Sequence, residues 1–245
     1  MRVDLYALTL NDRVLAPLFF KNYSWVDYFH FYDYGSDEAD LNVLKSYPNT
    51  EIVSLDFDDI IKNYGWKKYS VGEITQIPFN THVKELKDNM WKKARGKADW
   101  VVVIDFDEFT YHPDMRSLLE KLNKEDYMII STQGWEVVMD VVPTEMKNLY
   151  GLRANQFDKW AVFNPCIEEI NYSLGSHKAA PPIDYKRYCS DDVKLFHMKK
   201  ACGYDYWFWR RKTVLERVYG ARITEERMEW RLEYKVDGFN KVKII

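Results

Sequence analysis

The sequence predicts an α/β fold in which a mostly parallel central sheet is flanked by helices. Apolar, strand-like segments alternate along the first half of the 245 residues with segments whose apolar side chains recur at helical spacing. This alternation is typical of a sheet with crossover helices. The run at 100–104, Trp-Val-Val-Val-Ile, is apolar throughout, as expected of a central parallel strand buried on both faces. Acidic turns follow these segments, and ligands bind beyond the carboxyl ends of such strands.

Each predicted element follows from its local pattern. Apolar runs that end in polar or turn-forming residues predict strands at 3–10, 28–32, 51–55, 100–104 and 127–131. Helical spacing of the apolar residues predicts helices at 13–24, 37–46, 79–95 and 114–123. The second half is less regular, because residues 133–185 mix strand-like pieces with Gly, Pro and Asn. The basic-aromatic stretch at 199–232 is expected to be helical.

Composition narrows the class of protein. Hydrophobic residues make up 47% and charged residues 30% of the chain, which is the balance of a globular protein with a sizeable core. The net charge of −3 argues against a nucleic-acid-binding surface, and no apolar run approaches the ~20 residues of a membrane span. The N-terminal segment is too short and too charged for a signal peptide, and the three widely spaced Cys suit reduced thiols. We therefore expect a cytoplasmic protein with no transmembrane segment.

The strongest candidate site is the acidic sequence Asp105-Phe106-Asp107-Glu108, directly after the central strand. Residues two apart on an extended chain point the same way, so Asp105 and Asp107 are expected to face one site while Phe106 packs into the sheet. Two adjacent carboxylates repel each other unless a cation lies between them. Mn²⁺ or Mg²⁺ suits such an oxygen-only site, which keeps positions for diphosphate oxygens. The structural alternative is an acidic strand end that pairs with Lys or Arg.

Further polar candidates lie near predicted strand ends or in loops. Asp33 and Asp37 follow the second strand, where a carboxylate can accept hydrogen bonds from ribose or base groups; taken alone, this segment is better explained as a turn. His197 closes the short apolar run 193–197 and is a candidate third metal ligand, the alternative being a structural histidine. His177 lies in a polar loop, where it could contact diphosphate or the acceptor, or simply belong to a surface turn.

Taken together, these segments resemble the GT-A glycosyltransferases, specifically the family-2-like group with a short catalytic domain. The resemblance covers most of the chain in order and approximate spacing. Five blocks carry it: Leu10-Asn11-Asp12 with the following helix, the segment from Val26 to Asp37, the segment from Trp100 to Phe109, the segment from Lys159 to His177, and His197-Met198-Lys199-Lys200. The third block is similar to the DxD motif of that group. The resemblance implies a GT-A, Rossmann-like sheet with an irregular acceptor side and a C-terminal helical elaboration.

The resemblance also implies a role for each candidate residue. Asp107 would coordinate a metal ion that bridges the donor diphosphate, with Asp105 as a further metal ligand and His197 as a ligand to the metal or the diphosphate. Asp33 would hold the nucleotide base or ribose, and Asp105 would also touch the ribose or sugar. The remaining candidates for donor binding are Asn89, His177 and Lys199.

At the catalytic base the sequence departs from the inverting enzymes of the group, which carry an acidic pair. Glu136 and Asp140 lie in the corresponding stretch and are the candidates for the base, with Glu145 nearby, although none stands in a matching motif. Trp135 could form an apolar wall for a sugar ring. Because the base is not marked by a motif, inverting and retaining stereochemistry both stay open.

The expected function is metal-dependent transfer of a sugar from a nucleotide-diphosphate donor to a hydroxyl group of a glycan, lipid-linked or other acceptor. A single catalytic domain is expected over 1–245, with a nucleotide-sugar-binding half at 1–110, an acceptor-side half at 111–198 and a helical extension at 199–245. The extension includes Tyr206-Trp207-Phe208-Trp209-Arg210-Arg211-Lys212, which could make weak contact with a membrane surface. The simpler interpretation is a helix with one core face and one solvated face.

Two other functions fit parts of the sequence. A phosphatase of the haloacid-dehalogenase type would use Asp105 as nucleophile, Asp107 as acid/base and Asp191-Asp192 as distal metal ligands. Two features count against it, because Phe109 stands where that motif has Thr or Val, and a long α/β region precedes the motif. The second alternative is a non-catalytic protein that binds sugar nucleotides or glycans on the same scaffold.

Overall fold

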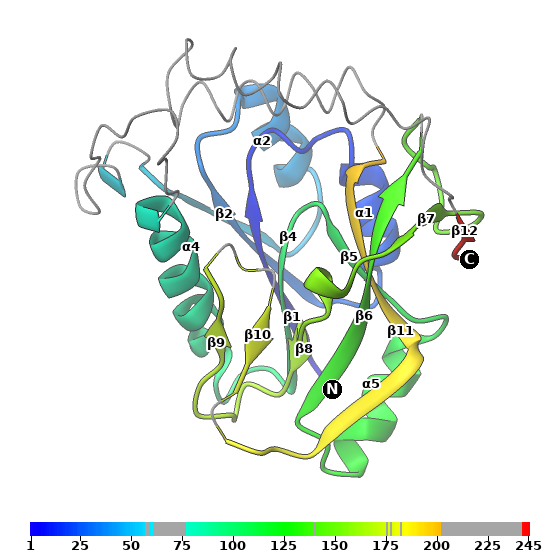
Figure 1. The fold of residues 1–245 in the computed structure, drawn as a ribbon. Helices are drawn as coiled ribbons and strands as arrows, with labels where there is room; N and C mark the ends of the chain where they lie inside the picture. Colours follow the sequence, from blue (N-terminus) through cyan, green and yellow to red (C-terminus); the bar gives the residue numbers. More distant parts are fainter. Residues whose placement is uncertain are drawn as a thin grey trace.

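The computed structural model describes residues 1–56, 59–60, 77–139, 141–174, 176, 178–181, 183–201 and 242–245. One large mixed sheet forms its centre, and helices lie on both faces of this sheet (Figure 1). This arrangement confirms the predicted α/β class.

The first half of the sheet consists of four parallel strands in the spatial order β3 (Thr50–Ser54), β2 (Tyr28–Asp33), β1 (Val3–Thr9) and β4 (Trp100–Asp105). The ends of all four strands lie within one residue of the predicted positions. Every residue of β1 is buried, and β4 is buried up to its last residue. Their apolar patterns are strong for this reason.

The second half of the sheet is mixed in direction. β8 (Val162–Phe163) lies between β4 and β6 (Ile129–Val138), and beyond β6 follow β7 (Tyr150–Arg153) and β12 (Val242–Lys243). β11 (Arg187–Lys200) pairs with β6, and β5 (Glu108–Tyr111) pairs with β11. Among the described strands, β5, β7 and β8 run against the common direction, so the sheet is mostly parallel. β9 (Asn171–Tyr172) and β10 (Ala179–Ala180) form a separate two-stranded sheet.

The helices divide the core into two layers (Figure 1). On one face, the buried side chains of α1 (Ala16–Asn22) and α5 (Met115–Lys124) share a core with Leu5 and Val102. On the other face, α4 (Ile77–Asn89) and the 3₁₀ turn η1 (Met90–Ala94) pack against Tyr6 and Val103. Because neighbouring residues of β1 and β4 enter opposite layers, these strands are buried on both faces, as the run at 100–104 predicts.

Aspartates mark the starts of two helices. α2 (Glu38–Lys45) begins after Asp37, whose carboxylate accepts a hydrogen bond from the N–H of Asp40 at 2.9 Å. α5 begins after Asp114, which accepts from the N–H of Ser117 at 3.1 Å. Each carboxylate satisfies an N–H that has no partner within the helix. The buried residues of α5 recur at helical spacing, which is why the sequence predicts this helix closely: Met115, Leu118, Leu119 and Leu122.

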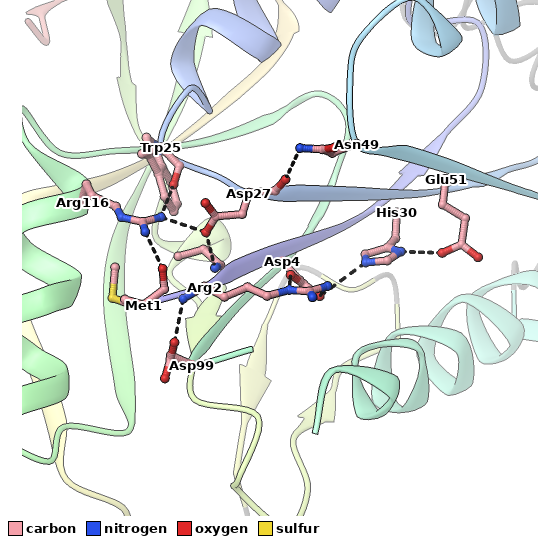
Figure 2. A network of polar contacts seen from close by, with 11 residues as sticks. Met1, Arg2, Asp4, Trp25, Asp27, His30, Asn49, Glu51, Asp99 and Arg116 are labelled. Carbon is pink, nitrogen blue, oxygen red and sulfur yellow. Dashed lines mark hydrogen bonds and ion pairs between the residues drawn. The ribbon is translucent and has the colours of Figure 1, made fainter. Parts of the chain in front are cut away.

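Charged side chains link the amino ends of the parallel strands (Figure 2). Arg2 pairs with Asp4 at 2.7 Å, and the imidazole of His30 lies between Asp4 and Glu51, at 3.5 and 2.6 Å. Lys93 completes the chain by pairing with Glu51 at 2.9 Å. Burial raises the pKa of the Asp4 carboxyl, but hydrogen bonds from His30 and Arg2 outweigh this effect and hold its pKa below the usual value.

A second group of contacts attaches α5 to the start of β1 (Figure 2). The Arg116 guanidinium pairs with the Asp27 carboxylate at 2.8 Å and donates to the carbonyl oxygens of Trp25 and Met1. Asp27 in turn accepts a hydrogen bond from the N–H of Val3 at 2.7 Å. Together with the Arg2–Asp4–His30–Glu51–Lys93 chain, these contacts form what we call the amino-end network.

The largest differences from the predicted elements lie in β6 and β11. β6 continues through residues 133–138, where the sequence predicts irregular structure, because β7 and β11 pair with this part of the strand. Gly134 permits a close approach within this strand, since the backbone carbonyl carbon of Phe157 lies 2.5 Å from the position that a Cβ would take. β11 includes residues 199–200, so the region predicted as a helical extension begins as a strand.

Most of the predicted extension, including the basic-aromatic segment 206–212, lies outside the described residues. Within the part of the chain that is described, no helix is both long and apolar enough to cross a membrane. Cys166 and Cys189 are free and exposed.

Candidate functional site

The carboxyl ends of the parallel strands bring two predicted site residues to one edge of the sheet. Asp105, at the end of β4, is in register with Leu8 of β1, and Asp33, at the end of β2, is in register with Thr9. Because Leu8 and Thr9 are consecutive, the strands on either side of β1 deliver Asp33 and Asp105 to the same edge. This is the edge at which α/β sheets bind ligands.

The acidic sequence forms the turn between β4 and β5. Asp105 is the last residue of β4, residues 106–107 form the turn, and Glu108 is the first residue of β5. Phe106 is fully buried and stacks on Phe19 of α1, with 4.1 Å between the ring centroids. The prediction that Phe106 packs into the core is therefore confirmed.

Asp107 lies beside a histidine–glutamate pair. Its buried carboxylate is 4.0 Å from Nε2 of His197, and Nδ1 of His197 is 3.1 Å from Oε2 of Glu136. The N–H of Met198 donates to the carbonyl oxygen of Asp107 at 2.6 Å, which holds the turn against β11. Glu108, His197 and Glu136 are in register on β5, β11 and β6. Strand pairing thus gathers residues from three distant parts of the sequence.

The contact between Glu136 and His197 determines how the imidazole faces Asp107. With Nδ1 bonded to Glu136, Nε2 is the nitrogen directed at Asp107, as in metal-binding histidines whose other nitrogen donates to a carboxylate. Burial lowers the pKa of His197, but the negative charges of Glu136 and Asp107 outweigh it and raise the pKa overall. An imidazole nitrogen and a carboxylate oxygen fit a divalent cation. Among the described residues, no group of three or more His, Cys, Asp or Glu side chains forms a metal site by itself.

Asp105 has a different partner. Its carboxylate pairs with Nζ of Lys87 of α4 at 2.7 Å; the Lys87 side chain is fully buried, whereas that of Asp105 is 33% exposed. Burial raises the pKa of Asp105, but the positive charges of Lys87 and Lys159 outweigh it and lower the pKa, even though Asp107 opposes them. Asp105 is therefore an ionised carboxylate that can reach solvent.

Glu108 is held by the second buried lysine. Nζ of Lys159 lies 2.6 and 2.5 Å from the two carboxylate oxygens of Glu108, and both side chains are almost completely buried. Glu108 also accepts a hydrogen bond from the N–H of Asp105 at 2.9 Å, while Lys159 donates to the carbonyl oxygen of Ser176 at 3.2 Å. Two of the three carboxylates in the acidic sequence thus pair with lysine, which is the structural alternative raised by the sequence.

Sequence reasoning assigned no role to Lys87 or Lys159. A signal for Lys87 was present, because it lies at helical spacing from Val83, Met90 and Trp91, all of which are buried. A lysine on the apolar side of a helix needs a buried partner of opposite charge. For Lys159 the local sequence carries no comparable pattern, since its partner comes from a distant strand.

The other predicted donor-binding residues are engaged in local contacts. The Asp33 carboxylate accepts hydrogen bonds from the N–H groups of Gly35 and Ser36 at 3.0 Å, so it holds the turn together. Asn89 is exposed, donates to the carbonyl oxygen of Glu85 at 2.7 Å and accepts from Lys92 at 2.8 Å. The structure therefore does not bring Asn89 to Asp105.

The remaining candidates lie on β6 or β11, between β6 and β7, or outside the described residues. Lys199 is half-buried on β11, two residues after His197, where its charge lowers the pKa of that imidazole. Glu145 pairs with Lys147 at 3.2 Å, and Trp135 packs against the core layer that contains α1. Asp140 and His177 lie outside the described residues.

The distal carboxylates of the phosphatase interpretation lie toward the other end of β11. Asp192 precedes His197 by five residues, which corresponds to roughly 16 Å along an extended strand. Asp191 contacts Gln133, and the N–H of Asp192 donates to the hydroxyl of Ser190 at 3.2 Å. These carboxylates are therefore not assembled with Asp107.

Comparison with known proteins gives one family match. The model of glycosyltransferase family 92 matches residues 21–149. No curated protein matches the sequence.

Several solved structures are similar in part. Residues 1–349 of S. aureus TarS align with a TM-score of 0.45 and 10% identity, over 97% of this chain and 74% of that chain. Core-mannan synthase A from Aspergillus fumigatus, in a Mn/GDP form, gives a TM-score of 0.38 and 9% identity over 59% and 45%. A mannosyltransferase from S. cerevisiae gives 0.34 and 9% over 58% and 40%.

Proposed function

Because the chain belongs to glycosyltransferase family 92, we propose that it moves a sugar from a nucleotide-diphosphate donor to a hydroxyl group of a glycan, lipid-linked or other acceptor, with Mn²⁺ or Mg²⁺ bound at Asp107 and His197. The observation that carries this proposal is the grouping of Asp107, His197 and Glu136 at the end of β4. This group lies at the ligand-binding edge of the sheet.

The chemistry of these side chains supports a divalent cation. Asp107 offers a carboxylate oxygen, and His197 offers the nitrogen that is directed toward it. Glu136 holds the opposite side of the ring, which fixes the orientation of the imidazole. A cation with only two protein ligands keeps positions for the oxygens of a diphosphate. When bound, it would neutralise the negative charge that grows on the leaving diphosphate.

Asp105 is suited to a different part of the donor. Its low pKa keeps it ionised, and its partial exposure leaves the carboxylate within reach of a ligand. A carboxylate accepts hydrogen bonds from ribose or sugar hydroxyl groups, and we propose this role for Asp105. Lys199 follows His197 on the same strand, which supports a contact with the diphosphate. Asp33 would act through the turn that it stabilises beside the nucleotide.

Glu136 can serve either as the base that deprotonates the acceptor or as the residue that orients His197. Both of its carboxylate oxygens lie within 3.2 Å of Nδ1 of His197. This contact favours the orienting role, because an oxygen that accepts from the imidazole is less available to an acceptor hydroxyl. Asp140 stays a prediction for the base.

Binding of nucleotide sugars tests the proposed function directly. Calorimetry with a panel of UDP-, GDP- and ADP-sugars, with and without Mn²⁺, would be run on the wild type and on Asp107→Ala. We expect one donor class to bind in the presence of Mn²⁺ and to lose most of its affinity in Asp107→Ala. Asp192→Ala is the matched control, since it removes an exposed carboxylate of β11 that has no part in the proposed site.

The outcomes separate the competing functions. If no donor binds the wild type with or without Mn²⁺, the glycosyltransferase proposal is wrong. If the wild type instead releases phosphate from phosphoesters and Asp192→Ala loses this activity, the phosphatase interpretation gains support. If a donor binds but no acceptor is ever glycosylated, a non-catalytic binding protein is the better description.

A further inference from the structure

Lys87 is a buried ammonium group with incomplete hydrogen bonding. The side chain is fully buried, and its ion-pair partner is Asp105 at 2.7 Å. An ammonium carries three N–H donors, yet no other described residue accepts a well-aligned hydrogen bond from Nζ. Buried polar groups are nearly always paired, so this group points to a ligand oxygen that is present during function.

A buried hydroxyl with no partner lies on the same side of the acidic turn. Tyr172 of β9 is 1% exposed, and its hydroxyl has no hydrogen-bond partner among the described residues. The Tyr172 ring lies 5.8 Å from Nζ of Lys87. Its backbone N–H donates to the carboxylate of Asp88 at 2.8 Å, so the strand that carries Tyr172 is fixed to the helix that carries Lys87. The buried Lys87 ammonium and the ring of Tyr172 are thus held close together.

The charges around the acidic turn are divided between two sides. On the Asp105 side, the carboxylates of Asp105 and Glu108 are matched by the ammonium groups of Lys87 and Lys159. On the Asp107 side, the carboxylates of Asp107 and Glu136 lie beside the His197 imidazole. The two ammonium groups favour an anionic ligand on the Asp105 side.

We propose that Lys87, assisted by the Tyr172 hydroxyl, binds an anionic oxygen of the donor diphosphate when Asp105 turns away from it toward a donor hydroxyl. The proposal rests on the proposed function. In the free protein, Asp105 covers Lys87 and neutralises it, and the exposed side of Asp105 is the route by which a ligand approaches. The incoming group must be anionic, since a neutral hydroxyl could not replace the charge of Asp105. Lys87 is then a donor-binding residue, with Asp105 as its resting partner.

The test compares two lysines of α4. Lys87→Met removes the proposed diphosphate contact. Lys84→Met is the matched control. Lys84 lies on the same helix and pairs with Asp88, but its side chain is 31% exposed, whereas that of Lys87 is fully buried. The probes are UDP, GDP, ADP and inorganic pyrophosphate, titrated by calorimetry at saturating Mn²⁺. We expect Lys87→Met to weaken the diphosphates that bind the wild type at least tenfold (about 1.4 kcal/mol), and Lys84→Met to change them less than twofold.

A second variant distinguishes loss of binding from loss of folding. Lys87→Met/Asp105→Asn leaves no unpaired charge at the site, and its thermal unfolding shows whether it is folded. Binding of Mn²⁺ alone should be unchanged in Lys87→Met, since the cation is held on the Asp107 side.

Each other outcome overturns the inference in a recognisable way. If Lys87→Met binds diphosphate as tightly as the wild type while Asp107→Ala does not, Lys87 has no role in donor binding but the proposed function stands. Equal losses in Lys87→Met and Lys84→Met would show that α4 itself, and not the Lys87 ammonium, is responsible. If the wild type binds no diphosphate at all, the proposed function and this inference fail together.

Discussion

Charged side chains are paired differently at the two ends of the parallel strands. At the amino ends, Arg2, Asp4, His30 and Glu51 form a chain of ion pairs (Figure 2), and Lys93 pairs with Glu51 at its end. At the carboxyl ends, the carboxylates of Asp107 and Glu136 lie beside the His197 imidazole. The buried Lys87 ammonium has Asp105 as its ion-pair partner but no further acceptor, and the buried Tyr172 hydroxyl has no hydrogen-bond partner, among the residues that the structure describes. Fixed partners make the amino-end network structural. At the carboxyl ends, the open donor positions of Lys87 and Tyr172 leave interactions for a ligand to complete.

One contact at the carboxyl ends does not follow this division and has the largest expected effect on stability. The Lys159–Glu108 pair is buried and fully engaged, so Lys159→Met leaves a buried carboxylate without its partner. We expect a loss of about 3–5 kcal/mol of unfolding free energy, measured by urea denaturation. Lys159→Met/Glu108→Gln should recover part of this loss, because no unpaired charge remains. A loss of less than 1 kcal/mol in Lys159→Met would mean that the Lys159–Glu108 ion pair does not stabilise the fold.

Removing Glu136 sharpens the comparison on the functional side. In Glu136→Ala, His197 loses the carboxylate that orients its ring, and we expect Mn²⁺-dependent donor binding to weaken about 10–100-fold. Glu136→Gln keeps an acceptor for the imidazole N–H and should retain most of the binding. The contrary result, normal donor binding in both variants with no sugar transfer, would identify Glu136 as the catalytic base.

Removing Arg116 tests the structural side. Arg116→Ala loses the ion pair with Asp27 and the bonds to two carbonyl oxygens, and we expect a cost of about 1–2 kcal/mol. Donor affinity should not change, because the amino-end network lies at the far end of the strands. Lys121→Ala, an exposed change on the same helix, is the control and should stay within about 0.5 kcal/mol. A clear loss of donor affinity in Arg116→Ala would show that the amino-end network also affects donor binding at the opposite end of the strands.

The smallest expected effect is a pH dependence at the amino ends. The folded-state pKa of Asp4 lies below its unfolded value of 3.8. Its contribution to stability is therefore complete above that value and is lost as the pH falls through the folded-state pKa. Urea midpoints measured between pH 3 and pH 7 should show less acid sensitivity in Asp4→Asn than in the wild type. Identical acid sensitivity would mean that Asp4 is not specifically stabilised in the folded protein.

The sequence predicts the parallel half of the sheet well and the mixed half poorly. β1 and β4 are buried on both faces, so their apolar runs alone define them. β6 continues through Gln133, Gly134 and Glu136, which form no apolar pattern, because β7 and β11 pair with this part of the strand. Such pairing depends on contacts between distant segments and leaves no local periodicity to detect.

The same distinction applies to the site. The acidic sequence and His197 stand out locally, and the structure brings Asp107, His197 and Glu136 together. On α4, however, the sequence points to Asn89, whereas Lys87 is the residue that reaches Asp105. Two positions along a helix differ by about 200° in direction, so only the burial of one face distinguishes them.

The register of Glu108, His197 and Glu136 across three strands also has a consequence for folding order. Glu136 and His197 are separated by 61 residues of sequence, and β11 must insert between β5 and β6 before His197 meets either neighbour. Contacts over such separations form slowly, because a long loop has to close first. During synthesis, a nascent chain whose β11 has not yet emerged from the ribosome therefore has the acidic turn but not His197 beside it. The proposed cation site can therefore form only after β11 has joined the sheet.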